Sequence, residues 1–163
     1  MRSPCESSAA QAAHFSLSLW QIQTTGFVPG ATYSGAVTSA DIMPTLLSMA
    51  GMPPQTDVDG GSFVVAMLNR AVIVRPLYWH YPHYGNQGGT PSSAIRLGQW
   101  KLIEFFEDGR LELYDLSNDV GETKDLAKEE PERVKELHAI LQAWREKFGA
   151  KMPTPNPDFV ANP

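Results

Sequence analysis

The sequence predicts an α+β fold in which a small antiparallel sheet of three to four strands packs against a long C-terminal amphipathic helix. Two patterns carry the prediction. The segments WKLIEFFE and RLELYDL are joined by Asp108-Gly109, which is typical of a β-hairpin. The later segment PERVKELHAILQAWREKFG has one continuous apolar stripe, and such a stripe needs a sheet to cover.

The composition excludes several classes of partner. A net charge of -5 without any cluster of Lys and Arg argues against nucleic acid. There is no apolar run of about 18 residues, so we expect no membrane-spanning helix. Residues 1–20 lack the features of a secretory signal, and the single cysteine, Cys5, cannot form an internal disulfide. These features do not determine the cellular compartment of the protein.

Changes in composition divide the chain into four parts. Residues 1–25 are rich in Ser, Ala and Gln without a regular period, and we expect a disordered leader. Residues 26–70 should hold a helix and a connector, and residues 71–150 the main subdomain. Residues 151–163 form a Pro-rich tail that cannot pack as an element of its own.

A helix is expected from Thr38, with Ser39 as its N-cap, Pro44 in its first turn and Gly51 as its stop. Its core-facing residues should be Ile42, Leu46, Leu47 and Met49. The connector that follows, TDVDGGS, spaces Asp57 and Asp59 like a calcium loop. It lacks the further acidic positions and the terminal glutamate, so a plain turn is favoured over a calcium site.

Strands are predicted at Ala71–Tyr81, Ser93–Leu97 and Trp100–Phe106, followed by the second arm of the hairpin. Pro76 should mark an edge or a strand start. A two-residue type I′ turn at Asp108-Gly109 would pair Glu107 with Arg110, Phe106 with Leu111, Phe105 with Glu112, Glu104 with Leu113 and Ile103 with Tyr114.

The C-terminal helix should begin at Pro131 and end before Gly149. His138 would lie at the boundary of the apolar stripe. The stripe consists of Val134, Leu137, Ile140, Leu141, Trp144 and Phe148.

The segment HYPHYGNQGG is the candidate site, because it places histidines, aromatics and amides in one irregular loop. His80 and His83 have HxxH spacing but no obvious further metal ligands, and one of them could serve as a general acid or base. A purely structural loop is a second interpretation. A third is a sugar- or aryl-binding loop that uses His80, His83, Tyr84, Asn86 and Gln87.

Arg96 and Lys101 lie on adjacent predicted strands and could face an anion, although solvation at the surface is the simpler account. No Ser-His-Asp arrangement, phosphate loop or pair of catalytic carboxylates can be argued from the spacing.

Three segments resemble the C-terminal portion of sulfatases of the arylsulfatase family. They are DIMPTLLSMAG, RLGQWKLI and LYDLSNDVGETKDLA, and the resemblance spans about Thr38 to Phe159. It implies an alkaline-phosphatase-like fold whose small C-terminal subdomain is an antiparallel sheet with a long helix. It also implies hydrolysis of aryl or carbohydrate sulfate esters by a longer protein, and full-length relatives are often exported.

The catalytic half of that family's pattern is missing from this sequence. Sulfatases of this kind oxidise the Cys or Ser of a C/S-x-P/A-x-R motif to formylglycine and bind Ca²⁺. Cys5 does not fit that motif, because Ser7 stands where Pro or Ala is required and Ala9 where Arg is required. No catalytic or calcium residue is carried over, so we expect no catalytic residue and no metal site in this chain.

The resemblance implies that this subdomain forms one wall of the substrate pocket. His80, His83 and Tyr84 would contact the non-sulfate part of a sulfated small molecule or glycan, with Asn86 and Gln87 in support. The first hypothesis is thus an inactive C-terminal sulfatase fragment. The alternatives are a non-catalytic carbohydrate-binding or interaction module and a fragmented reading frame. An exposed apolar face would favour self-association.

Overall fold

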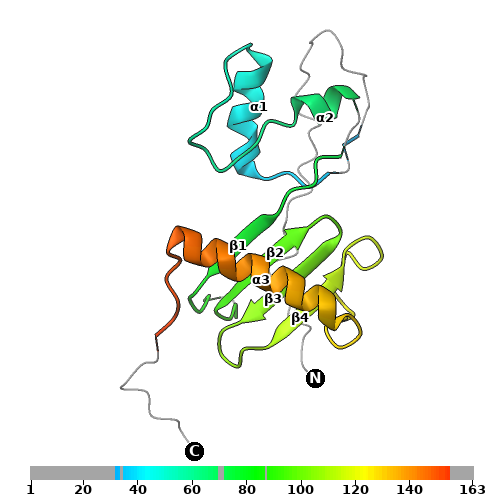
Figure 1. The fold of residues 1–163 in the computed structure, drawn as a ribbon, viewed down its shortest axis with the longest axis vertical. Coiled ribbons are helices and arrows are strands. Elements are labelled where there is room, and N and C mark those ends of the chain that lie inside the picture. The colour runs from blue at the N-terminus through cyan, green and yellow to red at the C-terminus, as the bar shows by residue number, and fades with distance from the viewer. Residues whose placement is uncertain (1–31, 34, 70–71, 87, 155–163) are drawn as a thin grey trace, which may run out of the picture. The chain divides into compact units, whose positions relative to one another are not determined.

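A computed structural model describes residues 32–33, 35–69, 72–86 and 88–154 of the chain (Figure 1). The predicted leader at residues 1–25 and most of the Pro-rich tail lie outside these residues. The chain divides into two compact units, with the boundary between Arg75 and Pro76. No helix among the described residues is both long enough and apolar enough to cross a membrane.

The unit that follows Pro76 confirms the predicted α+β fold. Its four strands form one antiparallel sheet in the order β1-β2-β3-β4, and a long helix, α3, follows them. The bounds are β1 Leu77–Tyr81, β2 Ser92–Leu97, β3 Trp100–Phe105, β4 Leu111–Asp115 and α3 Pro131–Phe148.

The first strand is shorter than predicted. Residues 72–76 belong to no strand, and β1 begins at Leu77, directly after Pro76. Proline has no N–H to donate to a ladder, so pairing starts after it. The prediction that Pro76 marks a strand start is confirmed, whereas the strand expected from Ala71 is wrong over residues 72–76.

The β3–β4 connection is longer than the predicted two-residue turn. Phe105 N–H donates to Arg110 O at 2.9 Å, which leaves the four residues 106–109 as the loop. A type I′ turn needs positive φ at both central residues, but of the Asp108-Gly109 pair Gly109 alone has it, with φ +70. The register is therefore shifted by two residues from the prediction. Because side chains alternate with a period of two, a shift of two residues leaves each side chain on the same face of the sheet as in the predicted pairing.

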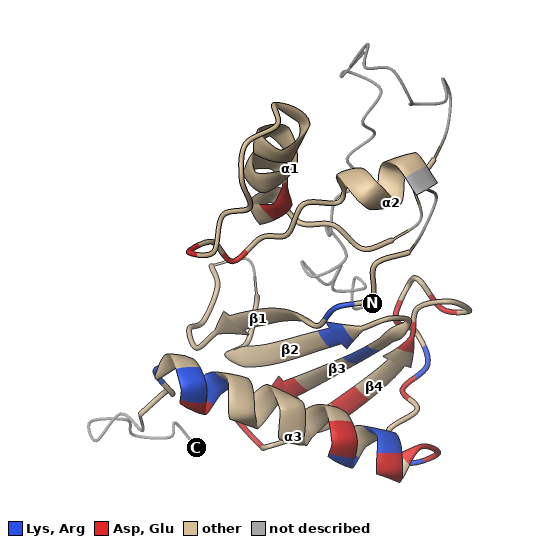
Figure 2. Cartoon of the chain, turned by 45° about the horizontal axis from the view of Figure 1, so that its top comes forward, with Lys and Arg blue, Asp and Glu red and all other residues tan. Residues whose placement is uncertain are grey.

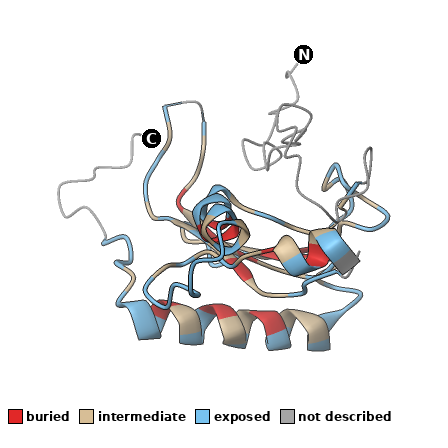
Figure 3. Cartoon of the chain, turned by 90° about the horizontal axis from the view of Figure 1, so that it is seen from above, coloured by how far each residue is buried: buried red, intermediate tan, exposed pale blue. Residues whose placement is uncertain are grey.

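The core lies between α3 and one face of the sheet (Figure 3). Leu137 and Leu141 of α3 are 1% and 0% exposed, in agreement with the predicted stripe. They pack on the central side chains of the sheet, which are Ile95, Leu102 and Leu113. Phe148, the last member of the stripe, is 59% exposed and so lies outside the core.

The ends of α3 follow the sequence signals. Pro131 is the first helical residue, and Gly149 ends the helix with φ +58, a left-handed conformation that favours glycine. Two polar contacts cross from the helix to the sheet. Arg145 and His138 lie 2.7 and 3.1 Å from the carboxylate of Glu104.

The other unit contains a 3-10 turn, Ser39–Asp41, and the helices α1 Ile42–Met49 and α2 Val64–Asn69. The N-cap is Thr38, not Ser39 as predicted, because Thr38 and Asp41 form a reciprocal capping box. Pro44 lies in the first turn of α1 and Gly51 follows its end, as expected. Helix α2 was not predicted, since six residues are too few to show a helical period.

The predicted core face of α1 is wrong in part. Ile42 and Leu46 are 43% and 41% exposed, whereas Asp41 and Thr45 are 1% and 4% exposed. The Thr45 hydroxyl donates to Asp41 O at 2.6 Å, so polar groups satisfy one another on the buried side.

We predict that Leu141→Ala lowers the free energy of unfolding of the chain by about 2–5 kcal/mol, because it opens a cavity against the sheet. Phe148→Ala, on the same helix but exposed, should change it by less than about 1 kcal/mol. Urea unfolding followed by circular dichroism measures both. Equal effects of the two variants would contradict the placement of the core.

Candidate functional site

The candidate site is the loop of residues 82–91, which joins β1 to β2. The β3–β4 loop touches it at the same end of the sheet. Phe106 N–H donates to Pro91 O at 2.9 Å, and the Tyr84 hydroxyl donates to Glu107 Oε1 at 2.9 Å. No local sequence signal predicts the contact of Tyr84 with Glu107. The two residues lie on different loops, which come together only when β2 pairs with β3.

Glycines give the loop a tight inner turn. Gly85 N–H donates to Gly89 O at 2.8 Å, and Gly88 N–H donates to Gly85 O at 3.1 Å. Gly88 has φ +87, which a residue with a Cβ rarely adopts. The turn leaves Asn86 exposed. Gln87, also a predicted site residue, lies outside the described residues.

His80 is held at both ring nitrogens. Its Nδ1 lies 2.6 Å from Ser93 Oγ and its Nε2 lies 2.8 Å from Lys151 O. The ring also contacts Phe106, with centroids 5.7 Å apart. With both nitrogens occupied, His80 is placed to fix the base of the loop and the chain after α3. Its predicted contact with substrate stays a prediction, and this geometry favours a positioning role instead.

His83 and Tyr84 are placed differently from His80. His83 is exposed, and its ring meets Tyr81 edge-on at 5.6 Å between centroids. Among the described residues, no hydrogen bond occupies its ring nitrogens. Tyr84 is 70% exposed. Its hydrogen bond to Glu107, with partial burial and the charge of Glu107, raises the pKa of Tyr84 above its ordinary value. The phenol proton is donated to Glu107, so toward a ligand the hydroxyl oxygen can act as an acceptor.

No metal centre forms in the described part of the chain, where no three His, Cys, Asp or Glu side chains come together. Asp57 and Asp59 are exposed there without a third acidic ligand. Cys5 lies outside the described residues. The residues at hand therefore do not fit the calcium ion or the formylglycine that the resemblance implies for longer proteins, and no chemical step is assigned to either group.

The two cations predicted to face an anion have different surroundings. Lys101 is 6% exposed and its Nζ lies 2.6 and 2.7 Å from the two carboxylate oxygens of Glu122. Arg96 donates from Nε to Gly98 O at 3.2 Å, and no carboxylate pairs with it among the described residues. Arg96 is thus available to an anion, whereas Lys101 is not.

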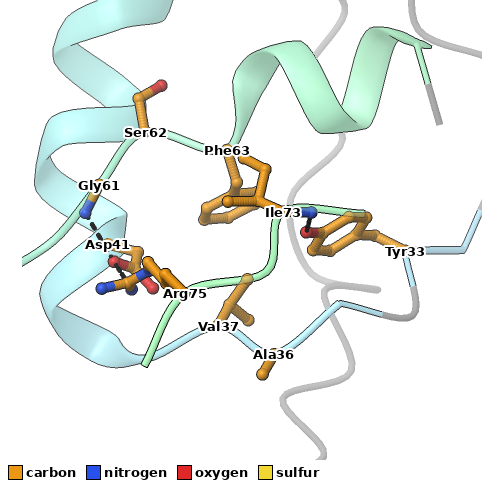
Figure 4. A pocket seen from close by; sticks show the side chains of 9 residues that line it. All are labelled: Tyr33, Ala36, Val37, Asp41, Gly61, Ser62, Phe63, Ile73 and Arg75. Atoms are coloured by element: carbon orange, nitrogen blue, oxygen red, sulfur yellow. Dashed lines mark hydrogen bonds and ion pairs between the residues drawn. The ribbon is translucent and has the colours of Figure 1, made fainter. Parts of the chain in front are cut away.

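A small pocket surrounds Asp41 in the unit that precedes Pro76 (Figure 4). The Asp41 carboxylate accepts from Thr38 N–H at 2.7 Å and Gly61 N–H at 2.8 Å, and it pairs with the Arg75 guanidinium. Both carboxylate oxygens are therefore occupied. The pocket walls, which include Phe63 and Val37, are largely apolar. These contacts assign Asp41 to the internal structure of its unit.

Comparison with known proteins gives relatives along most of the chain. Residues 21–147 match the family model described as N-sulphoglucosamine sulphohydrolase, C-terminal. The chain is 32% identical over 152 residues to a sulfatase from Formosa agariphila, covering 76% of this chain and 27% of that protein. It is 27% identical over 124 residues to arylsulfatase K from Danio rerio, covering 72% and 24%. The chain thus spans about a quarter of these relatives' length.

Solved structures show the same fold. One is a protein in complex with its substrate D-glucosamine-2-N,6-O-disulfate, with a TM-score of 0.65 and 26% identity over 78% of this chain and 28% of that one. Another is a 2-O GAG sulfatase, with a TM-score of 0.52 and 26% identity over 68% and 25%. The family match covers most of the chain and the fold agrees, so this chain belongs to the sulfatases, in the family of the N-sulphoglucosamine sulphohydrolase C-terminal region.

Proposed function

We propose that this chain supplies one wall of a sulfatase substrate pocket and contacts the non-sulfate part of a sulfated sugar. The observation that carries the proposal is the contrast within the loop of residues 82–91. Its base is fixed through His80 and Pro91, whereas His83, Tyr84 and Asn86 are exposed. A loop whose base is held in this way has less to order when its polar and aromatic groups bind a ligand.

The exposed groups suit a sugar. An aromatic face packs against the C–H groups of a sugar ring, and imidazole, phenol and amide groups give directional hydrogen bonds to its hydroxyls. Relatives point to amino sugars as the substrate class. One solved relative has D-glucosamine-2-N,6-O-disulfate as its substrate, and the N-acetylglucosamine-6-O-sulfatase of Bacteroides thetaiotaomicron is 27% identical to this chain over 127 residues.

In this proposal the chain binds and orients, and it does not cleave. His83 and Asn86 would hydrogen-bond ring hydroxyls, while Tyr84 would pack on the sugar or accept a hydrogen bond from one of its hydroxyls. Fixing the substrate's position lowers the entropic part of the activation free energy, because translation and rotation are already restricted on binding. Cleavage of the ester in a full-length protein would depend on segments for which this sequence holds no matching motif.

A carbohydrate-binding module without catalytic function is the second candidate. The favouring observation is that the loop's anchors, from His80 to Glu107, all lie in the unit that follows Pro76. Binding through the loop would then need no other part of a sulfatase. Self-association through exposed apolar side chains stays a prediction.

We expect D-glucosamine-2-N,6-O-disulfate to bind the loop with a Kd of about 1 mM, since a single sugar makes few contacts. Titration of the ¹⁵N-labelled chain should shift the amide signals of His83, Tyr84 and Asn86. Unsulfated glucosamine and inorganic sulfate serve as ligand controls. A titration that moves no loop signal at about ten times this concentration would refute the proposed contact.

Matched histidine variants separate contact from positioning. His83→Ala should weaken binding severalfold and leave the free energy of unfolding within about 0.5 kcal/mol. His80→Ala should lower that free energy by about 1–3 kcal/mol, because it leaves the buried Ser93 hydroxyl without its partner. The reverse pattern would show that His80, not His83, contacts the sugar.

We also expect the purified 163-residue chain to show no turnover of an aryl sulfate, because its sequence has no C/S-x-P/A-x-R motif. Release of the phenol, followed by absorbance, measures this. A full-length sulfatase assayed in parallel is the positive control. Turnover that co-purifies with the chain and disappears in one of its point variants would contradict the expectation.

A further inference from the structure

The sheet face opposite α3 carries two exposed aromatic side chains on β1. Tyr78 stacks on Trp144 of α3, with centroids 4.7 Å apart, so the alternate residues Trp79 and Tyr81 lie on the opposite face. Trp79 is 42% exposed and Tyr81 is 54% exposed. Their partners on β2 are the small residues Ala94 and Ser92, which cannot cover the rings.

Arg96 lies on the same face as these rings. It is two residues from Ala94, the partner of Trp79, so Arg96 and Trp79 are diagonal neighbours in the ladder. Side chains so related are about 7–8 Å apart at their backbones, within reach of an arginine. The strands β2 and β3 each carry one basic residue, coloured blue in Figure 2. The basic residue of β3, Lys101, is paired with Glu122, whereas Arg96 has no carboxylate partner among the described residues.

This combination of groups defines the chemistry of a ligand. Aromatic faces favour the C–H face of a sugar ring, and a guanidinium binds a tetrahedral oxyanion with two parallel hydrogen bonds. A purely apolar partner would leave the Arg96 charge without compensation in the contact. An anionic sugar satisfies both features at once.

We propose that Trp79, Tyr81 and Arg96 bind a second sulfated sugar residue of an oligosaccharide, beside the one at the loop. The proposal rests on the proposed function in taking a sulfated glycan as the ligand. Tyr81 connects the two places, because its ring contacts His83 of the loop at 5.6 Å between centroids. A glycan held at the loop would thus continue along β1.

The test compares a sulfated monosaccharide with a longer ligand on the full 163-residue chain. The probes are D-glucosamine-2-N,6-O-disulfate and a heparin tetrasaccharide, with the desulfated tetrasaccharide as ligand control. Calorimetry and ¹⁵N shifts give the affinities. Trp79→Ala and Arg96→Gln should each weaken tetrasaccharide binding about tenfold and leave the monosaccharide titration unchanged.

Matched control variants come from α3. Phe148→Ala removes an aromatic ring that is 59% exposed, and Arg133→Gln removes an arginine that pairs with Glu136 at 2.7 Å. Neither should change tetrasaccharide binding. If Trp79→Ala fails to fold by circular dichroism, Arg96→Gln carries the test alone, because its side chain makes one local hydrogen bond to Gly98.

The outcomes separate this proposal from the proposed function. Unchanged tetrasaccharide affinity in Trp79→Ala and Arg96→Gln, with loop binding intact, overturns the second sugar contact alone. Tetrasaccharide binding that depends on Trp79 and Arg96 while the loop variants have no effect supports the contact and counts against the loop. Sedimentation showing that Trp79→Ala dissociates an oligomer, without any effect on glycan, would assign the face to a second copy and also overturn the proposal.

Discussion

The packing of α3 on the sheet is the interaction on which the larger unit depends. A four-stranded antiparallel sheet of five- and six-residue strands leaves its apolar side chains in water unless another element covers them. Leu137 and Leu141 provide that cover for Ile95, Leu102 and Leu113. Each fully buried side chain of this kind contributes about 1.5–3 kcal/mol, so the contact fixes which sheet face is interior.

The same helix also reaches the candidate site. Near its end, Trp144 stacks on Tyr78 at 4.7 Å with the rings 5° from parallel, and Arg145 lies over the Phe106 ring at 5.5 Å. Just beyond it, Lys151 O meets His80. The base of the loop is therefore built from β1, the β3–β4 loop and the end of α3 together. A substitution of Trp144 or Arg145 would reach the loop through these contacts, without touching a ligand.

The parts of the fold that local periodicity controls could be predicted from the sequence. The stripe of α3 and its ends at Pro131 and Gly149 are of this kind, because helix period and capping are local. The register of the hairpin could not be predicted in this way, since the Asp-Gly pair fits both a two-residue and a four-residue loop. The backbone conformation of Asp108 determines which of the two loops forms. The partners of His80 could not be predicted from the sequence, because Ser93 and Lys151 come close to it only in the folded chain.

The alternation of side chains along β1 links the packing of the core to the proposed glycan contact. Tyr78 and His80 face α3 and are held there, whereas Trp79 and Tyr81 lie on the other face and remain exposed. Because the period is two, a slip of one residue would exchange these sets, burying the exposed rings and exposing the anchors. A slip of two would preserve them. The core under α3 therefore determines which face of the sheet can meet a ligand, and the covered face gives the exposed one its fixed geometry.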